Sequence, residues 1–238
     1  MDITVAKDVY PLAETFTIAR GSRDAAEVLT VHVTERELAG WGECVPYARY
    51  GESMTSVADQ IKRLGVVTDR MALQDMLPSG AARNAVDCAL WDLGAKRAGK
   101  RVWDLAGLPA PGPVQTAFTL SLDVPENMRA AASRHSHRPL LKIKLGTPDD
   151  MARLEAVREG APQAPIIVDA NEGWTAEIYT DLAPHLVRLG VRIVEQPLPA
   201  GQDGMLAEIV RPLPVCADES CHDRASLPNL KGKYDMVN

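Results

Sequence analysis

The 238-residue sequence lacks the features that mark secreted and membrane-spanning chains. Its first stretch, MDITVAKDVYPLAETF, has no basic segment followed by an apolar one and so does not resemble a signal peptide. Nowhere do about 18 apolar residues follow one another, as a transmembrane helix requires. The four cysteines are widely spaced, which favours inert thiols over a disulfide framework. These absences predict a cytoplasmic protein that does not contact a membrane.

The sequence also lacks any block of lysine and arginine. Acidic residues outnumber basic ones by 32 to 26, and the net charge is −6. This balance argues against binding to nucleic acid or to an anionic membrane. We therefore expect a small-molecule partner, while the oligomeric state is left open and a homo-oligomer is compatible with the sequence.

Residues 1–110 predict an α+β domain. Apolar and polar residues alternate over 26–35, and a second strand returns over 36–47, with the turn near 37–40. Apolar residues then recur at helical spacing within 80–100, where Gly99 is the expected stop. The linker LPAPGPVQ is rich in proline and marks the boundary with a second domain, residues 111–238.

The second domain alternates short β-rich runs with segments of helical length, which predicts a parallel sheet. The expected strands lie within VQTAFTLSL, LLKIKLG, PIIVDAN, VRIVEQP, LPVCADES and YDMVN. Four of them end in charged residues at intervals of about 25 residues, the length of one βα unit. This pattern indicates an α/β fold of the TIM-like (β/α) barrel type, whose chemistry lies at the carboxyl ends of the strands. Closure needs eight strands, so the six found here describe an incomplete barrel.

Three of these charged residues are acidic: Asp169, Glu195 and Asp218. If their strands are neighbours, the carboxylates converge, and like charges in a partly buried place need a cation. A ligand set made only of oxygen favours Mg²⁺, with Mn²⁺ as a second choice, over zinc.

Lys142 and Lys144 lie two positions apart in the preceding strand and so share one face. Each ammonium disfavours the charge of the other, so one of them is expected to act as a base near neutral pH. An amine base beside a metal suits removal of a proton α to a carboxylate. The simpler alternative is that the lysines and acids only neutralise one another inside the barrel.

The combination of KIK, DAN, EQP and ADES resembles the enolase superfamily, in its muconate lactonizing enzyme subgroup. Within that subgroup, IARGSR (18–23), GECVPYARYGES (42–53) and CADESCHDR (216–224) are most similar to the L-Ala-D/L-Glu dipeptide epimerases. The resemblance spans essentially the whole chain. It implies an N-terminal α+β capping domain and a Mg²⁺-dependent isomerase of small acidic dipeptides derived from cell-wall peptidoglycan.

The resemblance also implies individual roles. Lys144 would be one acid/base, while Lys142 would assist it electrostatically and lie near the substrate carboxylate. Arg23 would bind a carboxylate of the substrate, and Thr119 is a weaker candidate for a substrate contact. The metal ligands would be Asp169, Glu195 and Asp218, oriented by Asn171 and Glu219.

Epimerisation needs a base on each face of the substrate, and the family's second lysine follows a stretch similar to YDMVN, which closes this sequence at Asn238. The 238 residues are therefore expected to exchange the α-proton of one epimer without interconverting the two. Two alternatives stay open. One is a muconate cycloisomerase or o-succinylbenzoate synthase-like enzyme, and the other is an inactive, truncated chain.

Overall fold

The computed structural model describes residues 1–238, which divide into two compact units. The first unit contains Met1–Ala13 and Ala25–Pro113, and the second contains Glu14–Asp24 and Val114–Asn238. The sequence did not predict that Glu14–Asp24 groups with the second unit. This segment is the tip of a long hairpin, and its contacts are with the strand ends of the second unit, as described below.

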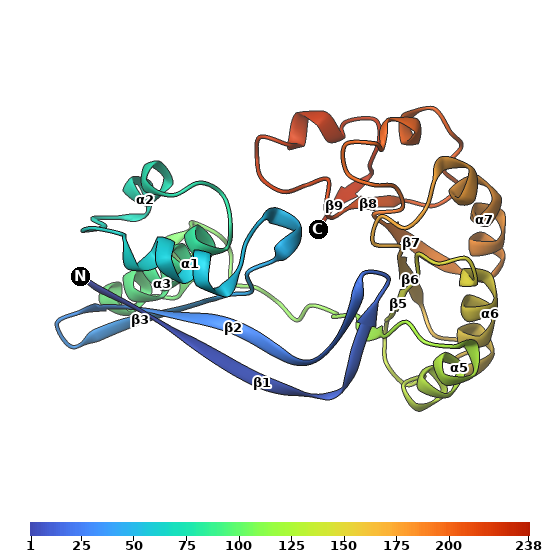
Figure 1. Ribbon diagram of the computed structural model, residues 1–238, viewed down its shortest axis with the longest axis horizontal. Coiled ribbons are helices and arrows are strands. Elements are labelled where there is room, and N and C mark those ends of the chain that lie inside the picture. The colour runs from blue at the N-terminus through green and yellow to red at the C-terminus, as the bar shows by residue number, and fades with distance from the viewer. The chain divides into compact units, whose positions relative to one another are not determined.

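A three-stranded sheet in the order β1 (Asp2–Ile18), β2 (Gly21–Glu35), β3 (Leu38–Cys44) runs through the first unit (Figure 1). β2 and β3 are antiparallel, in a register that runs from Leu29↔Cys44 to Glu35↔Leu38. The turn is formed by Arg36 and Glu37, slightly earlier than predicted, and Arg36 has a left-handed φ of 56°. The sequence did not predict a strand over β1, in which none of the residues is fully buried.

Helices cover one face of this sheet. The longest, α3 (Ala81–Ala98), confirms the predicted helix and ends at Gly99, whose φ of 60° is the left-handed conformation that glycine adopts most easily. The shorter helices are η1 (Ala48–Tyr50), α1 (Met54–Lys62), α2 (Arg70–Met76) and α4 (Val102–Leu105). Side-chain oxygens of Ser53 and Asp69 accept hydrogen bonds from the first turns of α1 and α2, which fixes where these helices begin.

Two glycines of β3 let α3 approach the sheet closely. A Cβ on Gly40 or on Gly42 would meet a backbone carbonyl oxygen of α3, Ala89 or Ala85 respectively, far inside the 3.0 Å that real Cβ atoms keep. The contact excludes water and buries Val31, Val33 and the inner face of α3 in one apolar core. The first unit therefore depends on backbone-to-backbone packing at these two positions.

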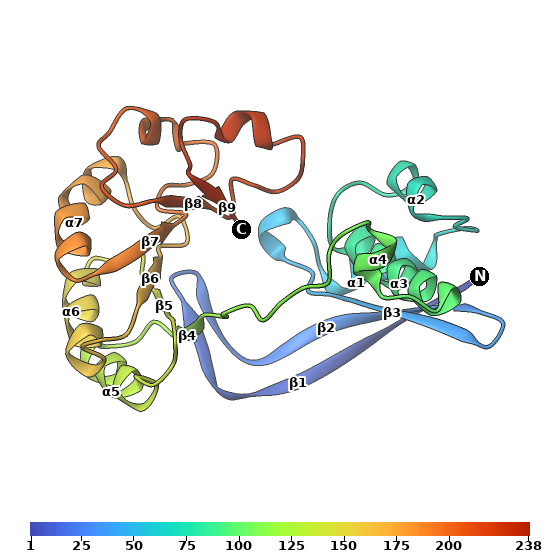
Figure 2. The same cartoon turned by 180° about the vertical axis from the view of Figure 1, so that it is seen from behind.

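The second unit contains a six-stranded parallel sheet in the order β4–β5–β6–β7–β8–β9. Its strands confirm all six predicted runs: β4 (Phe118–Leu120), β5 (Leu141–Lys144), β6 (Ile166–Asp169), β7 (Val191–Glu195), β8 (Val215–Ala217) and β9 (Met236–Val237). The helices α5 (Pro125–Arg134), α6 (Asp150–Gly160) and α7 (Ala176–Arg188) lie along the outer face of the curved sheet, as both views show (Figures 1 and 2). Two short turns of helix, η2 (Gly204–Ala207) and η3 (Leu227–Leu230), complete the unit. No helix in either unit is both long and apolar enough to span a bilayer.

We predict that Gly42→Ala lowers the free energy of unfolding by about 3 kcal/mol, because overpacking here meets backbone atoms that cannot turn aside. Gly65→Ala is the matched control, since a Cβ at Gly65 would have no neighbour within 4 Å. Urea unfolding monitored by circular dichroism measures both variants. Equal stability of Gly42→Ala and Gly65→Ala would contradict the close packing described here.

Candidate functional site

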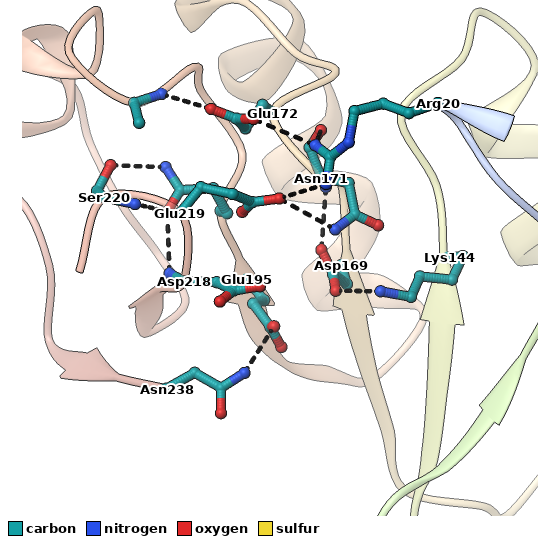
Figure 3. A network of polar contacts seen from close by, with 12 residues as sticks. Arg20, Lys144, Asp169, Asn171, Glu172, Glu195, Asp218, Glu219, Ser220 and Asn238 are labelled. Atoms are coloured by element: carbon teal, nitrogen blue, oxygen red, sulfur yellow. Dashed lines mark hydrogen bonds and ion pairs between the residues drawn. The ribbon is translucent and has the colours of Figure 1, made fainter. Parts of the chain in front are cut away.

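The carboxyl ends of four neighbouring strands bring the predicted site residues together. In the registers of the sheet, Lys144 of β5 lies beside Asp169 of β6, and Asp169 lies beside Glu195 of β7. Asp218 follows the end of β8, the next strand along the sheet. Figure 3 shows these side chains gathered at one end of the sheet.

The three acids can offer one oxygen each within 4.8 Å of one another, which is close enough to share an ion. Asp169 and Glu195 are almost completely buried, and Asp218 is partly buried. Asp218 forms no ion pair, so the lysines nearby do not neutralise the whole cluster. A donor set of three carboxylates without a thiolate or imidazole fits a hard divalent cation such as Mg²⁺.

Both lysines point into this cluster. The Nζ atom of Lys144 lies 2.6 Å from an oxygen of Asp169. Lys142 Nζ lies 2.9 Å from the same Asp169 oxygen and 2.7 Å from Glu195. Burial alone would lower the pKa of Lys142, but the charges of Asp169 and Glu195 reverse this and raise it above the usual value. The mutual repulsion expected within the lysine pair therefore does not dominate at Lys142, because the nearest charged neighbours of Lys142 are carboxylates.

The acids respond to their surroundings in different ways. Burial opposes ionisation of Asp169, yet Lys144 and Lys142 outweigh it and hold the pKa of this carboxyl below its usual value. Burial and the charge of Asp169 raise the pKa of Glu195 despite Lys142. Burial, together with the neighbouring acids, raises the pKa of Asp218 to about 6. Asp218 is thus the acid whose charge most needs a cation.

The loops after β5 and β6 touch through their backbones. A Cβ on Gly173 would lie 2.5 Å from the Cα of Gly146, and Gly146 itself has a φ of 110° that favours glycine. The buried carboxylate of Asp150 accepts hydrogen bonds from Gly146 N at 2.8 Å and from Trp174 Nε1 at 2.7 Å. These contacts fix the distance between the lysine strand and the strand that carries Asp169.

Sequence reasoning missed Gln196, which is completely buried and connects the ends of β7 and β8. Its Oε1 accepts hydrogen bonds from the backbone N–H groups of Asp218 at 2.9 Å and of Ser220 at 3.0 Å. Its Nε2 donates to Leu198 O, to Ser220 Oγ and to Tyr234 OH. In the sequence, Gln196 is recognisable only as a polar residue directly after the predicted ligand Glu195. The spacing of residues does not predict the hydrogen bonds that Gln196 makes.

The remaining predicted residues differ in position. Asn171 N donates to Asp169 at 3.0 Å, and Asn171 Nδ2 lies 3.4 Å from Glu219, so both residues border the cluster. Thr119 of β4 is in register with Lys142 of β5, and it lines a cavity of about 320 Å³ beside α5. Arg23 is exposed on β2, with its guanidinium 5.4 Å from the centre of the Phe16 ring, and no contact joins it to the acids.

Arg20 lies at the strand ends, and the sequence analysis did not single it out: the arginine it named in the same loop was Arg23, as a contact of the substrate carboxylate. Its guanidinium contacts Asn171 O at 2.8 Å, Glu172 at 3.1 Å and Glu219 at 2.7 Å. The motif IARGSR contains both Arg20 and Arg23, and only the position of the hairpin turn decides which of them faces these acids.

A capping unit followed by a parallel β/α unit with acids and lysines at its strand ends defines the class of enolase-like proteins. Comparison with family models agrees with the geometry: residues 1–107 match the mandelate racemase / muconate lactonizing enzyme N-terminal domain, and residues 123–237 match the enolase C-terminal domain-like family. The chain belongs to the mandelate racemase / muconate lactonizing enzyme family of the enolase superfamily.

Several relatives have known activities. The L-Ala-D/L-Glu epimerase of Escherichia coli is 46% identical, over 99% of this chain and 75% of that protein. An N-acetyl-D-glutamate racemase of a Pseudoalteromonas species is 42% identical, over 89% of this chain and 69% of that protein.

Solved structures are also similar to this chain. An enolase family member from Agrobacterium tumefaciens, with bound sodium and L-Ala-L-Glu, is 46% identical with a TM-score of 0.94, over 99% of this chain and 74% of that one. A dipeptide epimerase from Cytophaga hutchinsonii, complexed with Mg and D-Ala-L-Val, is 25% identical with a TM-score of 0.91, over 99% of this chain and 70% of that one.

We predict that Mg²⁺ binds the native protein with one site and that Asp169→Asn weakens this binding at least about tenfold, because the variant removes a charged ligand. Isothermal titration with MgCl₂ measures the affinity. Asp181→Asn, an exposed acid on α7, is the control and should bind as the native protein does. Equal binding by Asp169→Asn would show that the cluster is not the metal site.

A second prediction concerns the polar network behind Gln196. Burial opposes ionisation of Asp203, but hydrogen bonds from Lys233, Tyr234 and Ser220 hold the pKa of Asp203 below its usual value. A lowered pKa stabilises the fold at neutral pH, and this contribution is lost as the pH falls through and below about 4.

Asp203→Asn should therefore cost about 2 kcal/mol of unfolding free energy at pH 7, with the difference from the native protein shrinking in acid. Urea unfolding at a series of pH values tests this. Glu208→Gln, an exposed acid, should show no such dependence on pH. A deficit of Asp203→Asn that stays constant from pH 7 to pH 3 would argue against the ionised network.

Proposed function

We propose that the protein is a Mg²⁺-dependent isomerase that inverts the α-carbon of the glutamate in L-Ala-D/L-Glu dipeptides. The observation that carries this proposal is the placement of Lys142 and Lys144 against a cluster of three carboxylates. The epimerases and racemases among the relatives support the isomerase class. The cytoplasmic location, the origin of the dipeptide in peptidoglycan and any homo-oligomer stay predictions.

The three acids Asp169, Glu195 and Asp218 would hold the Mg²⁺ ion, with Mn²⁺ as a substitute to be tested. When bound, the ion supplies electrostatic stabilisation of the negative charge that develops on the substrate carboxylate as the α-proton leaves. Asn171 supports this arrangement through its backbone N–H, which holds one oxygen of Asp169. Gln196 supports it through Asp218, because Gln196 Oε1 accepts a hydrogen bond from the backbone N–H of Asp218.

The two lysines would divide the work of proton transfer. Lys144 Nζ would remove the α-proton from one face of the substrate, and inversion then requires that a proton reach the opposite face from a second base. Return of a proton by Lys144 itself gives exchange with solvent without inversion. Lys142, whose pKa is raised, stays protonated and would present its charge to the substrate carboxylate. The base would remove the proton, and the neighbouring positive charge would stabilise the negatively charged intermediate that results.

Substrate selection would fall to residues outside the acid cluster. Arg23 forms no ion pair within the chain, so its guanidinium is available for the side-chain carboxylate of the substrate's glutamate. Thr119 lies beside Lys142 on the neighbouring strand, close to where a bound substrate would sit. An N-acylated glutamate is the chemical group shared by L-Ala-Glu and N-acetylglutamate, so both are candidates for the test.

The experiment is exchange of the α-proton with solvent in D₂O, followed by NMR for L-Ala-L-Glu, L-Ala-D-Glu and N-acetyl-L-glutamate. We expect exchange by the native protein with Mg²⁺, and a loss of about 10³-fold in Lys144→Ala, because that variant removes the base. Lys62→Ala, on the exposed side of α1, is the control for loss of a lysine elsewhere.

Other outcomes separate the alternatives. Conversion of a muconate lactone without exchange of the dipeptides would favour a cycloisomerase. Exchange that persists in Lys144→Ala would remove that residue from the role of base. A folded chain that neither binds Mg²⁺ nor exchanges any of these compounds would be inert, and the proposal would be wrong.

A further inference from the structure

Arg20 lies at the tip of the hairpin between β1 and β2 and reaches the ends of two strands of the second unit. Nη1 donates to the carbonyl oxygen of Asn171 at 2.8 Å and to Glu172 Oε2 at 3.1 Å, and Nη2 donates to Glu219 Oε1 at 2.7 Å. The side chains of Glu172 and Glu219 are only 9% and 4% exposed, while that of Arg20 is 31% exposed. Figure 3 shows the guanidinium between these groups.

The backbone that carries Arg20 is fixed on the same unit. Leu122 N donates to Thr17 O at 3.0 Å, and Ser121 Oγ lies 3.4 Å from Thr15 O. A Cβ on Gly146 would lie 3.4 Å from the Cβ of Ala19, so the turn also rests against the loop after β5. The backbone that carries the guanidinium is therefore held in place by contacts with the loops near the strand ends.

The groups that Arg20 contacts lie next to the proposed metal ligands in the chain. Asn171 and Glu172 follow Asp169 by two and three residues, and both have left-handed φ angles, 44° and 69°. Residues other than glycine adopt this conformation only when their surroundings impose it. Glu219 follows Asp218 directly. One guanidinium thus joins the segment after β6 to the segment after β8.

We propose that Arg20 is a positioning residue, which sets the separation of Asp169 and Asp218 by cross-linking the segments that follow them. This inference rests on the proposed function, since it assumes that the two acids bind the same ion. The buried carboxylate of Glu219 has no other cation within reach, and its Oε2 has no hydrogen-bond partner. Without Arg20, this carboxylate would have to turn towards water, and the backbone of Asp218 would move with it.

Arg20 is not suited to bind the substrate, because two carboxylates of the chain already compensate its charge. The neighbouring Arg23, which has no acidic partner, is the candidate for that role. The two arginines of IARGSR therefore have separate tasks, and their variants should affect different measurements: Arg20 the metal affinity and Arg23 the KM of the substrate.

A positioning role must be separated from a simple effect of charge. Removing a positive charge near the acids would, by itself, strengthen Mg²⁺ binding, whereas loss of the cross-link would weaken it. Arg20→Lys keeps the charge but loses the planar fork that contacts three groups at once, so it isolates the geometric effect. Arg20→Met removes both.

The experiment is isothermal titration of the full chain with MgCl₂, with urea unfolding as a check on the fold. We expect Arg20→Lys to weaken Mg²⁺ binding about tenfold while the urea midpoint stays near that of the native protein. Arg134→Met is the matched control and should bind Mg²⁺ normally. Arg134 pairs with Glu14 of the same hairpin at 3.7 Å, but both side chains are mostly exposed.

A double-mutant cycle with Glu219→Gln gives a second, independent measurement. If Arg20 acts through Glu219, adding Arg20→Lys to Glu219→Gln should cost little further Mg²⁺ affinity, so the two effects should be clearly non-additive. This comparison holds even if Arg20→Met fails to fold.

Each outcome decides a different point. Native affinity in Arg20→Lys, or fully multiplicative effects in the cycle, would overturn the positioning role while leaving the proposed function intact. Tighter binding by Arg20→Met with an unchanged Arg20→Lys would show that the arginine acts through its charge alone. No Mg²⁺ binding by the native protein would overturn the proposed function and this inference together.

Discussion

Repulsion among three carboxylates is the constraint on which the rest of the second unit depends. Asp169, Glu195 and Asp218 end or follow adjacent strands, and burial makes their like charges costly. The chain opposes this cost with two ammonium groups on β5 and with backbone and amide hydrogen bonds to the segments that carry the acids. Asp218 remains without an ion pair, and its raised pKa shows that the positive groups of the chain do not fully offset its burial and the repulsion from the other acids.

The same constraint makes the two lysines unequal. Lys142 touches Asp169 and Glu195, so it is held as a cation, whereas Lys144 touches Asp169 alone. Alternation along β5 was enough to predict that both point to the same side. Their difference depends on which carboxylates the neighbouring strands bring within reach. A pattern of two identical residues in one strand therefore gives two different environments.

How much the sequence predicts depends on whether a feature is periodic. The six strands of the parallel sheet and helix α3 follow from apolar spacing, and the charged strand ends locate the acids and lysines. Arg20 and Gln196 belong to no period. Arg20 contacts residues 151 to 199 positions away, which only the folded sheet brings near. Likewise, the grouping of Glu14–Asp24 with the second unit depends on how far β1 extends, and its exposed residues give little signal.

The backbone contact between Gly146 and Gly173 has a consequence beyond packing. These glycines lie in the loops after the lysine strand and after the Asp169 strand, so any side chain at either position would separate base from acid. Proteins that diverge in substrate could change the cavity beside β4 and the outer helices without altering this contact. Evolution of new specificities on this scaffold should therefore keep both glycines, because their contact sets the distance between the lysine strand and the Asp169 strand whichever substrate is bound.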